Sequence, residues 1–552
     1  MGLPLAIVAI SGVLATKDTS KISEWKIFRR SFEVGFDNID KLKNVKKMLS
    51  LSFSDLPYRL KSCFLYLSMF PEGWMFKMFF IILLWIAEGF IPEMEDMTLE
   101  EVGELYFNEL CNRSLIQTAA EDVDEAVKYF VLHDLGGHNF SRVHTLLLFG
   151  AKGSISSVSF SELFGKYGRL KLLKVLDCQR LPLTTFPECV TKLYNLRYLN
   201  LSGTKVASIP RTIGRLRNLE MLNLENTLVE ELPAEILQLH RLFRVMAFQS
   251  INDGSAFTKL IGVHVPKDIG NLKFLQDLGV IRASEGGLEL MRSLGNLKQL
   301  RTLCIQQLEA EHGAALCSSI EKLSYLRRLY METREEAEIL EVQNISSPPQ
   351  CLQRLYMYGR LEMLPQWVPR LSSLVFLLLR WSKLRLDPLQ SLQALPNLQE
   401  LIFEKAYDGE ELCVKAGGFQ NLKRLVFICS SRLRKVTVEQ GAMPKLQELW
   451  LEDCKLLEEV PSGVEFLACL NELRIIDMGD QLLSKLDPSS QDSDFSRVKH
   501  VPMVYIGLSL IRNPSECIAG VGDLQQSSSF SLFDARASKR LFQVSGLYVF
   551  NL

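Results

Sequence analysis

The residues that could do chemistry in this sequence are few, because seven histidines are spread over 552 positions. One stretch brings four candidate metal ligands together: His133, Asp134, His138 and His144. Their spacing matches no familiar metal site, and the glycines between them indicate a turn, so no metal site is expected. No Ser/His/Asp or Cys/His arrangement stands out either. The sequence therefore predicts a protein that is not an enzyme.

A second set of residues suits binding. Tyrosine, tryptophan and arginine dominate the energetic centres of protein interfaces, because they combine a large rigid area with directional donors. Most residues at the open positions between regularly spaced leucines are of these types: Arg327, Arg328, Tyr330, Gln353, Arg354, Tyr356, Tyr358, Arg380 and Trp381, with Trp450 further along. We hypothesise that they bind a protein partner. The alternative is a solvated arginine face whose aromatic rings pack on their neighbours.

The element that must position these side chains is a short repeating strand. The pattern Leu-x-x-Leu-x-Leu begins at Leu173, Leu196, Leu219 and Leu242 in steps of 23 residues, and Pro187, Pro210 and Pro233 keep the same step. Later units begin at Leu275, Leu300, Leu326, Leu352, Leu374, Leu398, Leu422, Leu446 and Leu470, and a weaker first unit begins at Val143. Alternating apolar residues predict strands with one buried face, and the step is typical of a leucine-rich repeat.

Such repeats must stack, because one unit cannot bury its own apolar face. The leucines at positions one, four and six of the pattern should then form a continuous ladder inside the solenoid. The residues between them should point outward along one curved parallel sheet, which is the expected binding surface. The 33-residue step before Leu275 contains an insertion near residues 249–262, which we expect between strands.

Composition excludes several classes of protein. Lys+Arg number 63 against 64 Asp+Glu, which argues against a general nucleic-acid binder. Twelve cysteines without a C-x-x-C pair favour reduced intracellular thiols. The apolar runs at residues 2–15 and 78–87 are shorter than the roughly 20 residues that cross a bilayer, so we predict buried helices and no integral membrane span.

Residues 1–140 follow a different pattern from the repeats. A helix capped by Ser54 or Asp55 is expected first, and a second helix is expected from Glu100. A short strand is expected from Lys128. Several helices closed by a small hairpin favour a compact helical unit of winged-helix type.

Five motifs in this region carry a family resemblance. They are GLPLAI at 2–7, LSFSDLPYRLKSCFLYLSMFPE at 51–72, WIAEGFI at 85–91, NELCNRSLI at 108–116 and LHDL at 132–135. In this order, and leading into the repeats, they resemble the second half of the NB-ARC nucleotide switch of plant intracellular disease-resistance receptors, the coiled-coil NB-LRR class. The resemblance covers roughly residues 1–507 and ends with SRVKHVPMVYIG.

The resemblance implies a nucleotide site, of which two residues are present. Pro4 would line the adenine pocket and His133 would face the β-phosphate of ADP; the alternative for His133 is a partly buried side chain paired with Asp134 or the backbone. The sequence contains no G-x-x-x-x-G-K-[ST] motif, whose backbone N–H groups and lysine hold phosphates. We therefore expect no cofactor and no ATP hydrolysis for this chain alone, whereas full-length relatives use ADP and ATP.

The predicted fold is an α/β leucine-rich-repeat solenoid of about fourteen repeats, preceded by a small helical, winged-helix-like region. The expected domains are residues 1–50 (a residual helical part with GLPLA), 51–140 (winged-helix-like), 141–507 (repeats) and 508–552 (a poorly ordered tail).

The resemblance implies a truncated receptor that acts in plant defence. Expected partners are a pathogen effector, a guarded host protein or a full-length receptor, and the expected location is the cytoplasm, with peripheral attachment at the plasma membrane as an alternative. The competing interpretation is a free-standing repeat scaffold, regulator or decoy that binds no nucleotide.

Overall fold

The structure is a computed structural model. It describes residues 53, 56–67, 70, 78–95, 97–113, 116, 144–148, 172–251, 259–283, 287–486 and 494–507. The chain divides into two compact units, residues 1–181 with 195–199, and residues 182–194 with 200–552. Pro4, His133, the strand expected from Lys128 and the tail after residue 507 lie outside the described residues.

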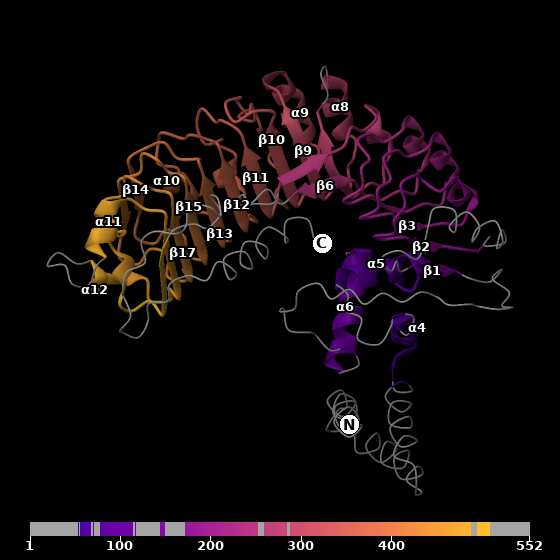
Figure 1. The fold of residues 1–552 in the computed structure, drawn as a ribbon, viewed down its shortest axis with the longest axis horizontal. Coiled ribbons are helices and arrows are strands. Elements are labelled where there is room, and N and C mark those ends of the chain that lie inside the picture. Colours follow the sequence, from indigo (N-terminus) through magenta and orange to yellow (C-terminus); the bar gives the residue numbers. More distant parts are fainter. Residues whose placement is uncertain are drawn as a thin grey trace, which may run out of the picture. The chain divides into compact units, whose positions relative to one another are not determined.

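Among its described residues, the smaller unit has three helices and two short strands that pair parallel (Figure 1). The helices are α4 (Tyr58–Leu67), α5 (Met78–Glu88) and α6 (Leu99–Asn112), and the strands are β1 (Thr145–Leu147) and β2 (Val175–Asp177). The buried helix predicted for the apolar run at 78–87 is confirmed, since Ile82 and Trp85 of α5 are fully buried. The helix predicted from Glu100 begins at Leu99, where Thr98 and Glu101 form a reciprocal capping box.

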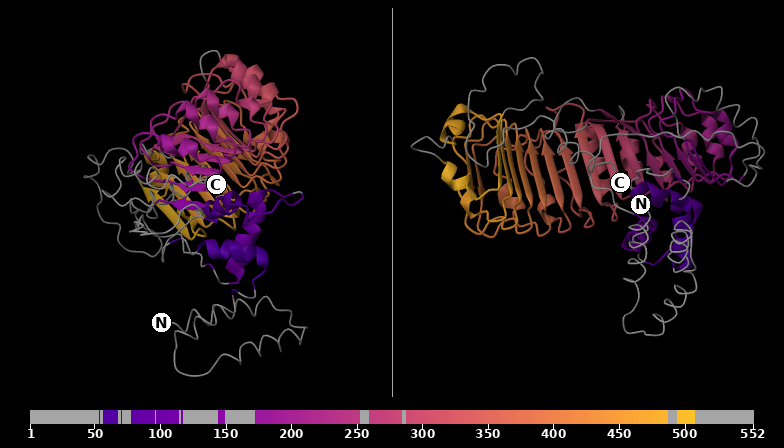
Figure 2. Two further views of the ribbon diagram at one scale, coloured as in Figure 1. Left: turned by 90° about the vertical axis from the view of Figure 1, so that its right-hand side faces the viewer. Right: turned by 60° about the horizontal axis from the view of Figure 1, so that its bottom comes forward.

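The larger unit is built on one curved parallel sheet (Figure 2). Its strands are β4 (Met221–Asn223), β5 (Arg244–Met246), β8 (Asp277–Arg282), β9 (Thr302–Leu308), β10 (Arg328–Thr333), β11 (Arg354–Tyr358), β12 (Phe376–Arg380), β13 (Glu400–Glu404), β15 (Arg424–Ile428), β17 (Glu448–Glu452), β18 (Glu472–Ile476) and β19 (Met503–Gly507). β3 (Tyr198–Asn200) falls where the chain passes between the units. The leucine ladder is confirmed: Leu329, Leu355 and Leu377 are register partners on successive strands and are fully buried.

Short helices return the chain from one strand to the next. Pro187, Pro210 and Pro233 each precede a 3₁₀-helix and take φ near −70°, the angle that the proline ring fixes. The 3₁₀-helices are η2 (Glu188–Lys192), η3 (Arg211–Arg215), η4 (Ala234–Gln238), η5 (Ile269–Asn271), η6 (Ala310–His312), η7 (Val368–Arg370) and η8 (Val464–Phe466). The α-helices are α8 (Leu288–Leu294), α9 (Gly313–Ile320), α10 (Leu389–Leu392), α11 (Asp480–Lys485) and α12 (Phe495–Val498).

The insertion before Leu275 forms a hairpin between β5 and β8. Its strands, β6 (Phe248–Ile251) and β7 (Lys259–Gly262), pair antiparallel. The side chain of Gln306 on β9 accepts a hydrogen bond from Gly262 N at 2.8 Å and donates one to Leu260 O at 2.9 Å. Gly262 lies so close to β8 that an added Cβ would be 2.6 Å from Val280 O. A larger residue at this position would therefore push the hairpin away from the sheet.

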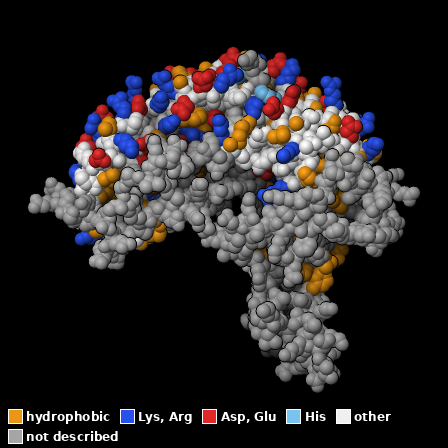
Figure 3. Space-filling view, viewed as in Figure 1, with side chains coloured by type: hydrophobic (Ala, Val, Ile, Leu, Met, Phe, Trp, Pro, Cys, Tyr) orange, Lys and Arg blue, Asp and Glu red, His pale blue; other side chains and the backbone are white. Residues whose placement is uncertain are grey.

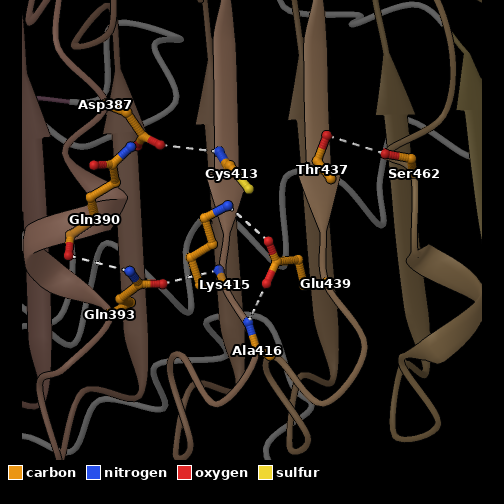
Figure 4. A network of polar contacts seen from close by, with 9 residues as sticks. All are labelled: Asp387, Gln390, Gln393, Cys413, Lys415, Ala416, Thr437, Glu439 and Ser462. Atoms are coloured by element: carbon orange, nitrogen blue, oxygen red, sulfur yellow. Dashed lines mark hydrogen bonds and ion pairs between the residues drawn. The ribbon is translucent and has the colours of Figure 1, made fainter.

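A second, two-stranded parallel sheet joins β14 (Glu411–Val414) to β16 (Lys435–Val438). Side chains hold its ends (Figure 4): Asp387 accepts from Cys413 N at 3.1 Å, and Glu439 pairs with Lys415 Nζ at 2.8 Å. Burial raises the pKa of Asp387 above its ordinary value. The hydrogen bond from Lys415 lowers the pKa of the exposed Glu439. These polar contacts tie the second sheet to its neighbouring segments.

Candidate functional site

The sheet face opposite the leucine ladder carries three rows of side chains, at positions three, five and seven of the repeat pattern. Strand register places equivalent residues side by side, and it pairs Arg328 with Arg354 and Tyr330 with Tyr356. Tyr358 is in turn the register partner of Arg380 on β12. The structure thus brings six of the ten sequence-predicted binding residues together on β10 to β12.

Of the other four predicted residues, Arg327, Gln353 and Trp381 flank these strands, and Trp450 lies on β17. Arg327 immediately precedes β10 and is exposed, and its N–H donates to Arg301 O at 2.8 Å. Trp381 immediately follows β12 and has φ of 61°, an unusual backbone angle for a large side chain. Its ring lies 6.0 Å from that of Tyr358, so Trp381 extends the aromatic group, whereas Arg327 lies at its border.

Position five forms an unbroken apolar row along the middle of this face from β9 to β17, and Val280 of β8, at position six, extends it through a register shift. The apolar row consists of Val280, Cys304, Tyr330, Tyr356, Leu378, Ile402, Val426 and Trp450, each the register partner of the next. All are buried in one hydrophobic cluster. The sequence reasoning selected only its aromatic members. Aligning the repeats would have found the aliphatic ones at position five, but not Val280, which joins the row only through the register shift in β8.

The aromatic rings of the row hold one another in place. Ring centroids are 6.0 Å apart for Tyr330 and Tyr356, 4.8 Å for Tyr330 and Tyr358, and 4.8 Å for Tyr356 and Phe376. The guanidinium of Arg354 lies 5.4 Å from the ring of Phe376, a residue that the sequence reasoning missed. These distances are typical of stabilising aromatic and cation–π contacts. The rings are therefore fixed before any partner arrives.

Ion pairs within the face neutralise many of its charges. Arg244 contacts Asp277 at 2.5 Å, Arg424 contacts Glu448 at 3.2 Å, and Arg380 contacts Glu404 at 3.1 Å. Burial raises the pKa of Glu404, while Arg380 opposes that rise by favouring the carboxylate. On the outer curve of the larger unit, basic and acidic side chains are also intermingled (Figure 3). The sheet face opposite the leucine ladder therefore resembles a protein-binding surface more than a charged patch that binds a polyanion.

Arg380 is the centre of the polar part of this surface. Its guanidinium lies 4.7 Å from the ring of Trp381 and 5.3 Å from the ring of Tyr358. Nearby, Tyr330 Oη donates to Glu332 Oε2 at 2.7 Å. Burial raises the pKa of Tyr330 and Tyr358, so both phenols stay protonated at neutral pH.

The site offers little for catalysis or metal binding. Burial raises the pKa of Cys304 to about 12, so this thiol stays protonated and is a poor nucleophile. Within the described ranges, no three His, Cys, Asp or Glu side chains gather as metal ligands. His133, Asp134 and His138 fall outside those ranges, so the expectation for them stays a prediction. In the part of the chain that is described, no helix is both long and apolar enough to cross a bilayer.

Family comparisons match the two parts of the chain separately. Residues 154–480 match the family model of a leucine-rich repeat region. Residues 69–136 match the model of a disease resistance protein winged helix domain. A leucine-rich-repeat protein of Leptospira interrogans aligns with 61% of this chain and 84% of its own, at 22% identity and a TM-score of 0.43.

Curated relatives are plant proteins. Disease resistance protein RPM1 of Arabidopsis thaliana is 35% identical over 91% of this chain and 58% of its own length. Disease resistance protein Pik-2 of Oryza sativa subsp. japonica is 27% identical over 86% of this chain and 55% of its own length. The chain thus spans somewhat more than half the length of these relatives. With a repeat solenoid preceded by a winged-helix match, the chain belongs to the leucine-rich-repeat disease-resistance proteins of plants, the NB-LRR family.

Proposed function

We propose that this chain acts in plant defence, in the cytoplasm, by recognising another protein. The recognition surface would be the inner face of β9 to β13, which is the sheet face opposite the leucine ladder. The observation that carries the proposal is the half-buried border of the apolar row, where Arg354, Arg380 and Trp381 present donors and ring surface. The row itself is at most 4% exposed and supports these side chains from behind. The role in plant defence is proposed because the relatives are named disease resistance proteins. A pathogen effector or a guarded host protein is the leading partner, and a full-length receptor is the alternative.

Recognition would use a preformed surface. The tyrosine rings are already packed, so binding would cost little side-chain entropy. Arg354, Arg380 and Trp381 are half-buried and offer donors and ring surface at its border. In the described part of the chain, the buried indole N–H of Trp381 has no acceptor, and a partner carbonyl could supply one. Because the Arg380 and Arg424 charges are already paired, association should depend only weakly on salt.

The proposal is tested by comparing variants of one surface with a matched control. The full chain would be used to co-purify proteins from infected and uninfected leaf extract, and the enriched protein would then be purified and titrated. Arg380→Ala and Trp381→Ala should weaken its binding at least about tenfold, the usual effect at an interface centre. Arg434→Ala removes a comparable arginine beside the second sheet, where it pairs with Glu458 at 3.1 Å, and should change nothing. Equal binding by all three variants would remove this surface from consideration.

The nucleotide question requires its own experiment, since Pro4 and His133 lie outside the described residues. We propose that the chain is not an enzyme and needs no cofactor. Calorimetry with ADP should then show no heat, as expected for a free-standing scaffold, regulator or decoy. Weak binding that His133→Ala abolishes would instead favour a residual switch. Phosphate release from ATP above background would contradict the non-enzymatic assignment.

A further inference from the structure

Four side chains from separate segments of the smaller unit meet at Glu88, the last residue of α5. The Glu88 side chain is only 6% exposed, and Thr145 Oγ1 of β1 donates a hydrogen bond to its carboxylate. Lys174, just before β2, donates to the backbone carbonyl of Glu88 at 3.3 Å and lies 3.7 Å from the carboxylate. Tyr66 of α4 shares a hydrogen bond with Thr145 Oγ1 at 3.3 Å.

This polar group lies among apolar side chains. Trp85 and Ile86 on α5 and Leu147 on β1 are all buried. A carboxylate with so little solvent is stable only when donors and a counter-charge surround it, and Thr145 and Lys174 supply both. Losing either partner would leave Glu88 poorly compensated. Helices and strands are thus joined here by contacts that depend on one another, whereas apolar packing alone would tolerate gradual change.

We propose that Glu88 is the hub of a latch that couples α4 and α5 to the first repeat strands, β1 and β2. The latch makes the helices and these strands open and close together. Its strength is limited, because an ion pair taken out of water recovers little more than its own desolvation cost. A contact of this kind fixes one arrangement and can still be released. This inference goes beyond partner recognition and is independent of the inner face of β9 to β13.

A charge exchange tests the latch. Glu88→Lys and Lys174→Glu each place like charges together, and the double variant restores an opposite pair with its direction reversed. Hydrogen–deuterium exchange would be followed for amides 78–88 and 145–147 in the full chain. Each single variant should speed exchange in both segments by about tenfold or more, whereas the double variant should return both toward the original rates. Amides of β10 to β12 should exchange as before.

Glu109→Lys is the matched control. Glu109 pairs with Arg113 at 2.7 Å within α6, so the same charge change there should speed exchange in α6 and leave β1 unaffected. If the Glu88→Lys chain fails to fold, Glu88→Gln and Thr145→Val provide a second cycle that keeps side-chain size. Faster exchange confined to the substituted segment, or a double variant no better than the worse single variant, would overturn the proposal.

Discussion

The early and late repeats of this solenoid share one leucine ladder but end their strands differently. In the early repeats, position five is Asn200 or Asn223, and each side-chain oxygen accepts the N–H two residues further on, Ser202 or Glu225, at 2.9 Å. That hydrogen bond turns the backbone, and β3 and β4 stop after three residues. From β9 to β17, position five is apolar, and the strands of the main sheet run for five to seven residues.

The difference shows how an asparagine at position five affects both strand length and surface chemistry, although β5 also stops after three residues with Met246 at that position. An asparagine uses its side chain on its own backbone, so it ends the strand and offers little to a partner. A tyrosine or valine leaves the backbone free to pair with the next strand and adds its surface to the inner face. The candidate site is therefore found where the asparagines stop.

The largest expected effect comes from giving a late repeat the early residue. Tyr356→Asn removes a ring that is 1% exposed and contacts Tyr330 and Phe376. The free energy of unfolding should fall by about 3–5 kcal/mol, as for other large aromatic losses in cores. Urea unfolding measures the change. Tyr325→Asn, at a ring that is 61% exposed, is the control and should cost far less.

A smaller effect is expected at the boundary between the two kinds of repeat. Gly262→Ala brings a Cβ to 2.6 Å from Val280 O, so the hairpin must shift, at a cost of about 1–3 kcal/mol. Thermal unfolding and exchange of the β7 amides would detect it. Gly507→Ala adds the same methyl group where nothing lies within 4 Å and should be neutral. Equal stability of the two variants would contradict the close approach of β7 to β8.

In the early repeats, Asn223→Ala removes the bond to Glu225 N and should cost about 1 kcal/mol, the usual net value of one hydrogen bond. The Glu225 amide should then exchange faster, which NMR or mass spectrometry can follow. Asn218→Ala removes an exposed bond to Tyr194 O and provides the comparison. If Asn223→Ala leaves Glu225 exchange unchanged, the asparagine does not hold this turn.

The smallest effect concerns the pH dependence of the ion pair between Lys415 and Glu439, which lies beside the second sheet. Lys415 holds the pKa of Glu439 below its ordinary 4.5 in the folded chain, because its hydrogen bond favours the carboxylate. The stabilisation is therefore present above pH 4.5 and is lost as pH falls through the lower folded value. The difference in unfolding free energy between the original chain and Glu439→Gln should shrink in acid. A difference that stays constant down to pH 3 would contradict the assignment.

The ladder could be predicted from its apolar periodicity, and the buried helix α5 from a continuous apolar run too short to cross a bilayer. The burial of Leu329 and Leu355 follows from the spacing of the pattern alone, and so does the assignment of the sheet face that carries the leucine ladder. Strand length could not be predicted in the same way, since it depends on whether a side chain such as Asn223 bonds to its own backbone. The insertion was placed correctly between strands, but its pairing into β6 and β7 depends on Gln306, which follows 44 residues after Gly262.

The candidate site, too, could be predicted only in part from the sequence. Tyrosine and arginine types suggested Tyr356 and Arg380, but the aliphatic members of the apolar row became visible only when strand register aligned them. The meeting of Tyr66, Glu88, Thr145 and Lys174 was beyond reach from spacing, because their segments are far apart in the chain. Polar contacts of this kind depend on tertiary packing, for which the sequence carries no periodic signal.

Because the apolar row follows strand register, a change in the number of repeats would change which side chains lie next to one another on the inner face. Each strand contributes one residue to the row, and each connects to the next through a whole repeat, such as the segment from Leu398 to Leu422. Gaining or losing one such unit by unequal recombination would preserve the ladder while sliding every later side chain by one strand spacing, about 4.8 Å. A new arrangement of inner-face side chains could thus arise in a single genetic event, while the packing of the leucine ladder stays the same.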